Sequence, residues 1–204
     1  STWCSICPGS IIMGSDEESI MIEGREQASR RSQLISLLPE GAWVVLKATT
    51  KKRRSNDTYY PYRQDSNFVY VTGYQEEPSQ DGEEAIVVIA ESGSWLFRIK
   101  PNAHHIRWEG PQPNNQEIKH MGQFTDVLPL DQFARFMTAR KAQINQVYGD
   151  TQQQAWYKEW LGKPCADAHP TLSQMRMVKS PAELALMQQA CDITVHAHRE
   201  TIKP

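Results

Sequence analysis

The clearest hydrophobic pattern in the chain is a pair of apolar runs near its middle. Residues 85–90 and 94–99 are rich in β-branched and aromatic side chains, and a short polar connection, residues 91–93, lies between them. A connection of this length joins antiparallel neighbours. A third run, residues 42–48, is equally apolar, which is typical of a buried strand. The pattern therefore predicts a β-hairpin and a further buried strand.

Three shorter segments also have the composition of strands. Residues 67–72 contain Phe-Val-Tyr-Val and end at Gly73, so we expect a strand there. Residues 126–130 form a short extended stretch, and residues 146–148 form a short strand by the same criteria. The strands are separated by polar segments, of which residues 49–57 are expected to form a loop.

Helical spacing dominates elsewhere. Residues 25–37 hold many Arg, Gln and Ser residues and few apolar ones, which predicts a surface helix. After Asp131, a suitable N-cap, Phe133, Phe136 and Met137 recur at helical spacing. Residues 151–161 form another helical segment, closed by a Gly and a Pro. Strands that alternate with helices indicate an α/β or α+β domain.

Ser180 opens the most distinctive helix signal. Its side chain can cap the helix, Pro181 fits the first turn, and Glu183 completes a capping box. Apolar residues, among them Leu184 and Met187, then share one face. Because an apolar helix face needs a surface to pack on, we expect residues 179–204 to be the first helix of a second, truncated domain.

Charge balance and the length of the apolar runs argue against two classes of partner. The 204 residues include 22 Lys and Arg against 24 Asp and Glu, a net charge of −2, which argues against a dedicated nucleic-acid binder. The longest wholly apolar run, residues 85–90, is far shorter than the roughly 20 residues of a membrane span. We therefore expect neither nucleic acid nor a membrane as a partner. The basic run 51–54 is interpreted as a solvated loop tip rather than a nucleic-acid patch.

Cysteine and histidine placement indicates no metal or redox site. Four cysteines are too few for a disulfide scaffold, so the chain is expected to be cytoplasmic with reduced thiols. Cys4 and Cys7 form a CxxC unit that lacks a second ligand pair and a following helix. His104 and His105 are adjacent, so they would point to different sides of a strand. We expect no metal ligand in this chain.

Residues 1–20 stand apart from the rest. They show neither regular periodicity nor the basic and apolar regions of a signal peptide. Residues 22–25, Ile-Glu-Gly-Arg, match a protease site used to remove tags. We interpret residues 1–20 as an extension outside the fold, either poorly ordered or derived from a tag.

Candidate interaction residues are densest in residues 55–73. This segment holds four tyrosines, and Arg63 lies between Asp57 and Asp65. Tyrosine and arginine together suit a contact surface. They also suit the edge of a core, with Arg63 paired to Asp57 or Asp65, and composition alone favours that structural interpretation.

The same segment carries a family resemblance. Residues 57–73, Asp-Thr-Tyr-Tyr-Pro-Tyr-Arg-Gln-Asp-Ser-Asn-Phe-Val-Tyr-Val-Thr-Gly, resemble the N-terminal domain motif of bacterial aminopeptidase P, the Xaa-Pro aminopeptidase. Further matches follow in the same order along residues 27–204: Arg30-Arg31, Leu96-Phe97, Ile-Arg-Trp-Glu-Gly at 106–110, and Met-Arg-Met-Val-Lys-Ser-Pro-Ala-Glu at 175–183. The predicted fold is accordingly an α/β domain with a mixed sheet of about six strands flanked by helices.

The resemblance implies a role in a two-domain metallopeptidase. Members release the N-terminal residue that precedes proline from short peptides, and two metal ions, usually manganese (Mn2+), activate a bridging water. The family's Asp, Asp, His, Glu and Glu ligands all lie in a C-terminal pita-bread domain. We therefore expect residues 21–178 to be the N-terminal domain, with no catalytic and no metal-binding residue, and the chain alone to be inactive.

The resemblance also implies candidate substrate-lining residues. A tryptophan matching Trp108 reaches towards a neighbouring subunit's active site in the family, so Trp108 is the first candidate, against the alternative of a rim residue packed on its own domain. Asp57 matches another position near that interface, and Tyr62 and Arg63 are further candidates that could instead hold their loop. A homo-oligomer, either a dimer or a tetramer, follows from this arrangement.

A second function remains open at this stage. Related N-terminal domains occur in non-enzymatic histone chaperones, so the chain could be a stand-alone module that binds a peptide or protein with its tyrosine-rich loop. A reading frame that continues past Pro204 with metal-ligand motifs would favour the peptidase, and one that stops there would favour the binding module.

Overall fold

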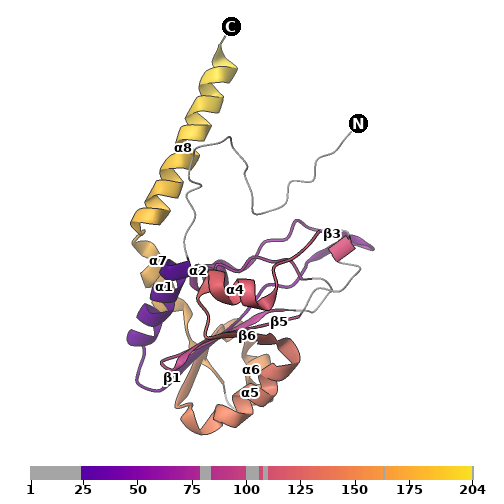
Figure 1. Ribbon diagram of the computed structural model, residues 1–204, viewed down its shortest axis with the longest axis vertical. Helices are drawn as coiled ribbons and strands as arrows, with labels where there is room; N and C mark the ends of the chain where they lie inside the picture. Colours follow the sequence, from indigo (N-terminus) through magenta and orange to yellow (C-terminus); the bar gives the residue numbers. More distant parts are fainter. Residues whose placement is uncertain (1–23, 79–83, 100–105, 108–109, 163, 204) are drawn as a thin grey trace. The chain divides into compact units, whose positions relative to one another are not determined.

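A computed structural model of the chain describes residues 24–78, 84–99, 106–107, 110–162 and 164–203 (Figure 1). These residues belong to two compact units that divide after Lys179. The larger unit, Ile22–Lys179, contains a mixed six-stranded sheet flanked by helices. The smaller unit contributes one described helix, α8 (Pro181–Ile202).

The six strands lie in the order β6-β5-β4-β1-β7-β8. β4 pairs antiparallel with both β1 and β5, while the pairs β5–β6, β1–β7 and β7–β8 are parallel. The strand bounds are β1 Ala42–Lys47, β4 Ile86–Ala90, β5 Gly93–Arg98, β6 Asp126–Pro129, β7 Gln146–Gly149 and β8 Ala166–Asp167. The predicted α/β fold with a mixed six-stranded sheet is confirmed.

The predicted hairpin and buried strand are both present. β4 and β5 pair in register from Ile86 opposite Phe97 to Ala90 opposite Gly93. Gly93 begins β5 with a φ of 147°, a conformation that a residue with a Cβ rarely adopts. β1 lies in the middle of the sheet, between β4 and β7, and nearly all of it is buried.

Helices cover both faces of this sheet (Figure 1). Val44 and Leu46 of β1 join a core with residues of α1 (Gly24–Ser36), α2 (Ser66–Thr72), α4 (Asn115–Gly122) and α7 (His169–Met177). Trp43 and Val45 point to the opposite core, formed with α5 (Phe133–Arg140) and α6 (Gln154–Leu161). Because both faces are covered, alternate positions of β1 are equally apolar, which explains its unbroken hydrophobic run.

The strand predicted at residues 67–72 is wrong, because this segment forms α2. The carboxylate of Asp65 caps the helix by accepting the backbone N–H groups of Asn67 and Phe68, each at 2.9 Å. Gly73 ends the helix in the left-handed conformation, with φ 69°. Phe68 and Val71, one helical turn apart, are both fully buried. Capping and tertiary packing together override the β-propensity of Phe-Val-Tyr-Val.

Other predictions need smaller corrections. The segment 49–57 was expected to be a loop but includes β2 (Arg53–Ser55), which pairs with β3 (Thr58–Tyr59). Asp131 does not cap α5, because it lies inside a short 3-10 helix, Leu130–Gln132, that precedes α5. The elements α4, α7 and β8 were not predicted. The helical segment 151–161 is confirmed as the 3-10 helix Thr151–Gln153 followed by α6.

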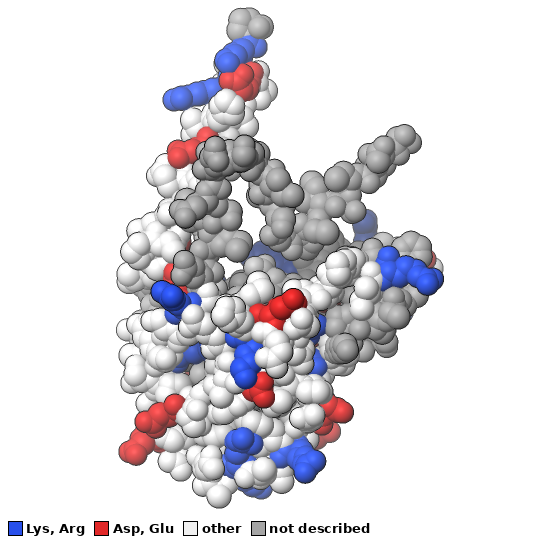
Figure 2. Space-filling model, viewed as in Figure 1, with Lys and Arg blue, Asp and Glu red and all other residues white. Residues whose placement is uncertain are grey.

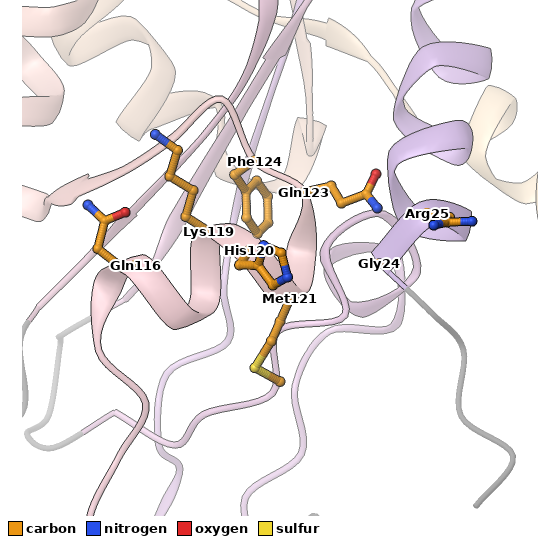
Figure 3. A pocket seen from close by; sticks show the side chains of 8 residues that line it. All are labelled: Gly24, Arg25, Gln116, Lys119, His120, Met121, Gln123 and Phe124. Atoms are coloured by element: carbon orange, nitrogen blue, oxygen red, sulfur yellow. The ribbon is translucent and has the colours of Figure 1, made fainter. Parts of the chain in front are cut away.

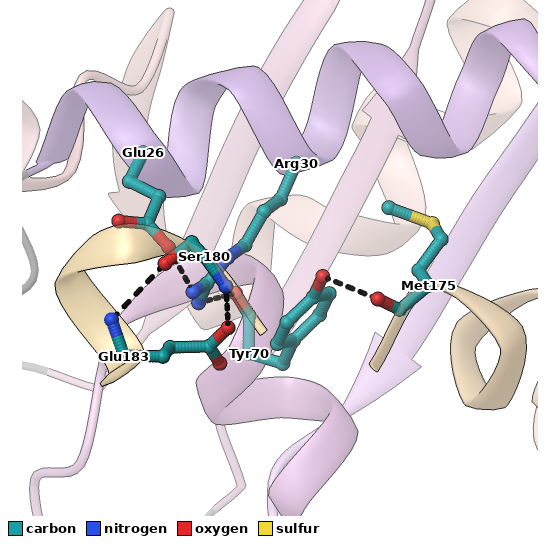
Figure 4. Close-up of polar contacts among 6 residues, drawn as sticks. All are labelled: Glu26, Arg30, Tyr70, Met175, Ser180 and Glu183. Atoms are coloured by element: carbon teal, nitrogen blue, oxygen red, sulfur yellow. Dashed lines mark hydrogen bonds and ion pairs between the residues drawn. The ribbon is translucent and has the colours of Figure 1, made fainter. Parts of the chain in front are cut away.

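α1 was predicted as a surface helix, and most of its polar residues, among them Arg25 and Gln33, are exposed or half-buried, but Gln27, Arg30 and Arg31 are buried. The guanidinium of Arg31 donates to the carbonyls of Val71 at 2.8 Å, Gly122 at 2.7 Å and Gln123 at 2.9 Å. Arg30 stacks on the ring of Tyr70, donates to its carbonyl at 3.1 Å and pairs with Glu26 (Figure 4). The Arg30-Arg31 motif therefore joins α1 to the ends of α2 and α4.

α8 begins with the predicted capping box. Ser180 Oγ accepts the N–H of Glu183 at 3.1 Å, and Glu183 Oε2 accepts the N–H of Ser180 at 2.9 Å (Figure 4). Its apolar residues Leu184 and Met187 are 55% and 53% exposed. Across the described residues, no helix combines the length and apolarity that crossing a bilayer requires. The assignment of α8 to a second domain stays a prediction.

Candidate functional site

The candidate residues belong to segments that start or end at one edge of the sheet. β1 and β5 both run antiparallel to β4, so they run parallel to each other and end where β4 begins. The segment that follows β1 carries Asp57, Tyr62 and Arg63, and the segment that follows β5 carries Trp108. A third segment, residues 73–85, leads into β4. We call the described residues of these three segments the site edge.

Thr49 anchors the first segment of the site edge. Its backbone N–H donates to Gln64 Oε1 at 2.6 Å, and its carbonyl accepts the hydroxyl of Tyr62 at 3.1 Å. Gln64 is buried, and its Oε1 also accepts the N–H of Asp65 at 3.0 Å. These bonds satisfy the backbone of β1 just beyond its end, where ladder hydrogen bonds are no longer available. Tyr62 and Gln64 thus hold the loop against the sheet.

Arg98 joins the other two segments. It is the last residue of β5 and is only 2% exposed. Its Nη2 lies 3.2 Å from Glu76 Oε2, and its Nη1 donates to the carbonyl of Pro113 at 3.0 Å. Tyr74 donates its hydroxyl to the same Glu76 oxygen at 2.8 Å. This charge-assisted network links the segment that leads into β4 to the segment that follows β5.

Two buried donors at the site edge lack a hydrogen-bond partner among the described residues. They are the Nε of Arg98 and the Nε2 of Gln64. Buried donors of this kind are usually satisfied by ordered water. Both side chains have their other polar groups bonded, so each remains fixed in place.

A small hairpin of β2 and β3 follows Thr49 and is separate from the six-stranded sheet. Its turn contains Asn56, with φ 32°, and Asp57, which is exposed. Lys51, at its base, forms an ion pair of 2.9 Å with Glu77 of the neighbouring segment. Asp57 is therefore placed at the tip of the hairpin.

Two tyrosines of the site edge, Tyr62 and Tyr74, have raised pKa values. Burial, with smaller effects from Glu77 and Glu84, raises the pKa of Tyr62 to about 12. Burial and the adjacent Glu76 raise the pKa of Tyr74 well above its usual value. Both phenols therefore stay protonated at neutral pH, where they act as hydrogen-bond donors rather than as bases.

The candidate residues predicted from the sequence differ in their surroundings. Trp108 lies outside the described residues. Tyr62 is half-buried and bonded to Thr49, whereas Asp57 and Arg63 are exposed. Among the described residues, no hydrogen bond or ion pair joins Asp57, Tyr62 and Arg63 to one another. The expected pairing of Arg63 with an aspartate is wrong, because the carboxylate of Asp65 caps α2 instead.

Gln64, Tyr74, Glu76 and Arg98 were not identified from the sequence as site residues. A signal for Arg98 was present, because a charged residue at the end of an otherwise apolar strand needs a partner. Nothing in the sequence indicated Glu76 as that partner, since only the pairing of β4 with β5 brings their segments together.

An open pocket lies elsewhere, between the start of α1 and the end of α4 (Figure 3). Its volume is about 670 Å³. Arg25, Lys119 and His120 give it a basic lining, and Phe124 and Met121 give it an apolar part. Of the candidate residues that the structure describes, Asp57, Tyr62 and Arg63 do not line this pocket.

Comparison with known proteins identifies the family. The family model "Aminopeptidase P, N-terminal domain" matches residues 27–148, more than half of the chain. The chain belongs to the aminopeptidase P family. Its matched residues span the site edge and five of the six strands of the sheet, β1 and β4 to β7.

Curated relatives agree with this family assignment. The chain is 31% identical over 185 residues to the Xaa-Pro aminopeptidase of Haemophilus influenzae, with 85% of this chain and 41% of that protein covered. It is 24% identical over 199 residues to the mitochondrial intermediate cleaving peptidase 55 of Arabidopsis thaliana, with 94% and 39% covered. The aminopeptidase P N-terminal domain and α8 thus span about two fifths of the length of these relatives.

Solved structures share the fold. Aminopeptidase P from E. coli with the inhibitor Pro-Leu superposes with a TM-score of 0.72 at 24% identity, covering 87% of this chain and 44% of that one. Proline aminopeptidase P II from Yersinia pestis gives a TM-score of 0.71 at 23% identity, with the same coverage. The aminopeptidase P N-terminal fold is therefore preserved at low sequence identity.

The described part of this aminopeptidase P domain does not fit a metal pair. Among those residues, no group of three or more His, Cys, Asp or Glu side chains lies close enough to hold a metal ion. Of the four cysteines, Cys165 is buried and Cys191 is exposed, both as free thiols, while Cys4 and Cys7 lie outside the described residues. We assign no metal chemistry to these residues.

Proposed function

We propose that this chain is the N-terminal part of a longer Xaa-Pro aminopeptidase, which releases the residue preceding proline from short peptides. The observation that carries the proposal is the family match over residues 27–148. The 41% coverage of the Haemophilus influenzae enzyme supports it, because a catalytic domain of ordinary size would account for the rest of such a protein.

The proposed work of the domain is to assemble a homo-oligomer, dimeric or tetrameric, and to restrict access to the active site. Loops from the site edge of one subunit would line the pocket of its neighbour, a symmetric arrangement. Trp108, Asp57, Tyr62 and Arg63 are the proposed lining residues. In support, three of them follow β1 and the fourth follows β5, and those strands end at the same sheet edge.

Chemistry is assigned to the rest of the enzyme. Two bound Mn2+ ions would lower the pKa of a water and polarise the peptide carbonyl. The residues of this chain would line the pocket and restrict access to it. The Thr49–Tyr62 and Arg98–Glu76 contacts would hold in place the loops that border the peptide. We therefore propose that residues 1–204 have no activity alone. A cytoplasmic location is part of the proposal, and cell fractionation checks it because one relative is named as mitochondrial.

The direct test is hydrolysis of an Xaa-Pro peptide. The 204-residue chain is incubated with a short peptide carrying proline second, with manganese and, separately, with a chelator. We expect the 204-residue chain to show no turnover in either case. A protein translated from the complete reading frame should hydrolyse the peptide. Chelator-sensitive turnover by residues 1–204 would contradict the domain assignment, and an inactive complete protein would contradict the enzyme assignment.

The assembly role is tested separately. In the complete protein, Trp108→Ala should raise KM for the peptide more than it lowers kcat, because the residue is proposed to contact substrate rather than the reacting atoms. Analytical ultracentrifugation should show an oligomer for the complete protein. A monomer with full activity would rule out a pocket completed by a neighbouring subunit.

A further inference from the structure

The β2–β3 hairpin carries positive charge that its folding does not require. Residues 50–66 contain five Lys and Arg against two Asp, an excess of three positive charges in a chain of net charge −2. All of β2 is exposed, and the hairpin is separate from the main sheet. Figure 2 shows Lys and Arg side chains projecting at the side of the molecule where Figure 1 places β3. Core packing therefore does not dictate these residue types.

Tyrosine rings support the cations of this hairpin. The Arg53 guanidinium lies 5.6 Å and the Lys51 ammonium 5.7 Å from the centroid of the Tyr59 ring. The Arg54 guanidinium lies 6.0 Å from the ring of Tyr60, which is 56% exposed. Cations held over aromatic rings have less freedom to lose when they bind a partner. Arginine and tyrosine are also the residue types that contribute most to protein interfaces.

Carboxylates already occupy the base of this surface. Glu77 pairs with Lys51 at 2.9 Å, and Glu84 pairs with Lys47 at the end of β1. Both carboxylates come from the segment that leads into β4. The cations further out, Lys52 and Arg54, are exposed and present the same chemistry to an external partner.

We propose that the outer surface of the β2–β3 hairpin binds an acidic segment of polypeptide. Its carboxylates would pair with Lys52 and Arg54, the arginine in bidentate geometry, and it would pack on Tyr60. A polypeptide suits this surface better than a nucleic acid, because outside the hairpin the chain is net negative and would repel an extended polyphosphate. This binding is independent of peptidase activity.

The test is binding of a fluorescent Glu-rich peptide to the chain, measured by anisotropy at low and moderate salt. A peptide with Gln at every Glu position is the reference and should bind much more weakly. The double variant Lys52→Glu, Arg54→Glu should weaken binding of the Glu-rich peptide by about tenfold, the sum of a few exposed ion pairs. Added salt should weaken the wild-type binding, since these pairs are screened.

The matched control reverses the same number of charges elsewhere. Lys141 and Lys158 are exposed, next to α5 and within α6. The double variant Lys141→Glu, Lys158→Glu should bind the peptide like the wild type, and both double variants should keep the wild-type circular dichroism spectrum and melting temperature. Tyr60→Ala provides an uncharged second probe and should also weaken binding.

A further comparison tests whether the acidic segment belongs to a partner protein rather than to a substrate. A Glu-rich peptide with a free Xaa-Pro terminus and its acetylated form should bind with equal affinity, and a preference for the free form would contradict the proposal. The proposal is overturned if the wild type does not bind, which would fit charges that merely keep an edge strand unpaired. It is also overturned if both double variants lose affinity equally, or if a single-stranded oligonucleotide binds more tightly than the peptide.

Discussion

Arg31 donates from Nη2 to the carbonyl of Gly122 at 2.7 Å, although the two residues are 91 positions apart in the chain. Its Nη1 donates to the carbonyl of Val71 at 2.8 Å. Both carbonyls lie in the last turns of helices, where intrahelical donors are lacking and the helix dipole favours a cation. Burial lowers the pKa of Arg31 to about 10, which leaves it charged at neutral pH. The side chain of Arg31 therefore caps the C-terminal ends of both α2 and α4.

Arg31→Met should lower the free energy of unfolding by about 3 kcal/mol, because it removes bonds to a charged donor and leaves buried carbonyls unsatisfied. Urea unfolding monitored by circular dichroism measures the change. Arg25→Met is the matched control on the same helix, since Arg25 is exposed, and its effect should stay within about 0.5 kcal/mol. Equal losses in the two variants would show that the buried contacts contribute nothing specific.

Asp65→Ala should destabilise the domain by about 1 kcal/mol, since it removes the cap that accepts the N–H groups of Asn67 and Phe68. Thermal unfolding measures the shift in Tm. Asp57→Ala, at the exposed hairpin turn, should leave Tm nearly unchanged. Asp65→Asn should recover most of the loss, because an amide oxygen also caps a helix. A loss as large in Asp65→Asn as in Asp65→Ala would indicate a role for the charge instead.

Arg98→Met should lower the free energy of unfolding by about 3 kcal/mol, as expected when a buried ion pair loses one partner. Glu76 would keep its carboxylate, which is only 20% exposed in the side chain, without the guanidinium. The double variant Arg98→Met, Glu76→Gln should be less destabilised than the sum of the two single variants. Additive losses would show that the two residues are not energetically coupled.

Alkaline pH should destabilise the domain through Tyr62. Its pKa is raised from 10.0 to about 12, so its contribution to stability is complete below pH 10 and is lost as the pH rises through about 12. Denaturant unfolding between neutral pH and pH 12 should show this loss, with a shallower slope for Tyr62→Phe. Identical slopes for the wild type and Tyr62→Phe would contradict the shift. An ultraviolet titration of tyrosinate gives an independent value.

Local signals in the sequence determine several elements by themselves. The hairpin of β4 and β5 follows from two apolar runs and a short connection, and the start of α8 follows from Ser180 and Glu183, three positions apart. The family follows from the motif around Tyr62 and Arg63, because a long ordered match is specific even where the roles of its members are unknown. These features depend on neighbours in the sequence.

Tertiary structure decided the rest. Residues 67–72 could form a strand or a helix by propensity, and burial of Phe68 and Val71 on one core selected the helix. The partners of Arg31 and Arg98 are distant in sequence, so their burial could not be predicted from local composition. The sheet order alone places the segments after β1 and β5 at one edge, because only strand pairing turns positions far apart in the chain into neighbours.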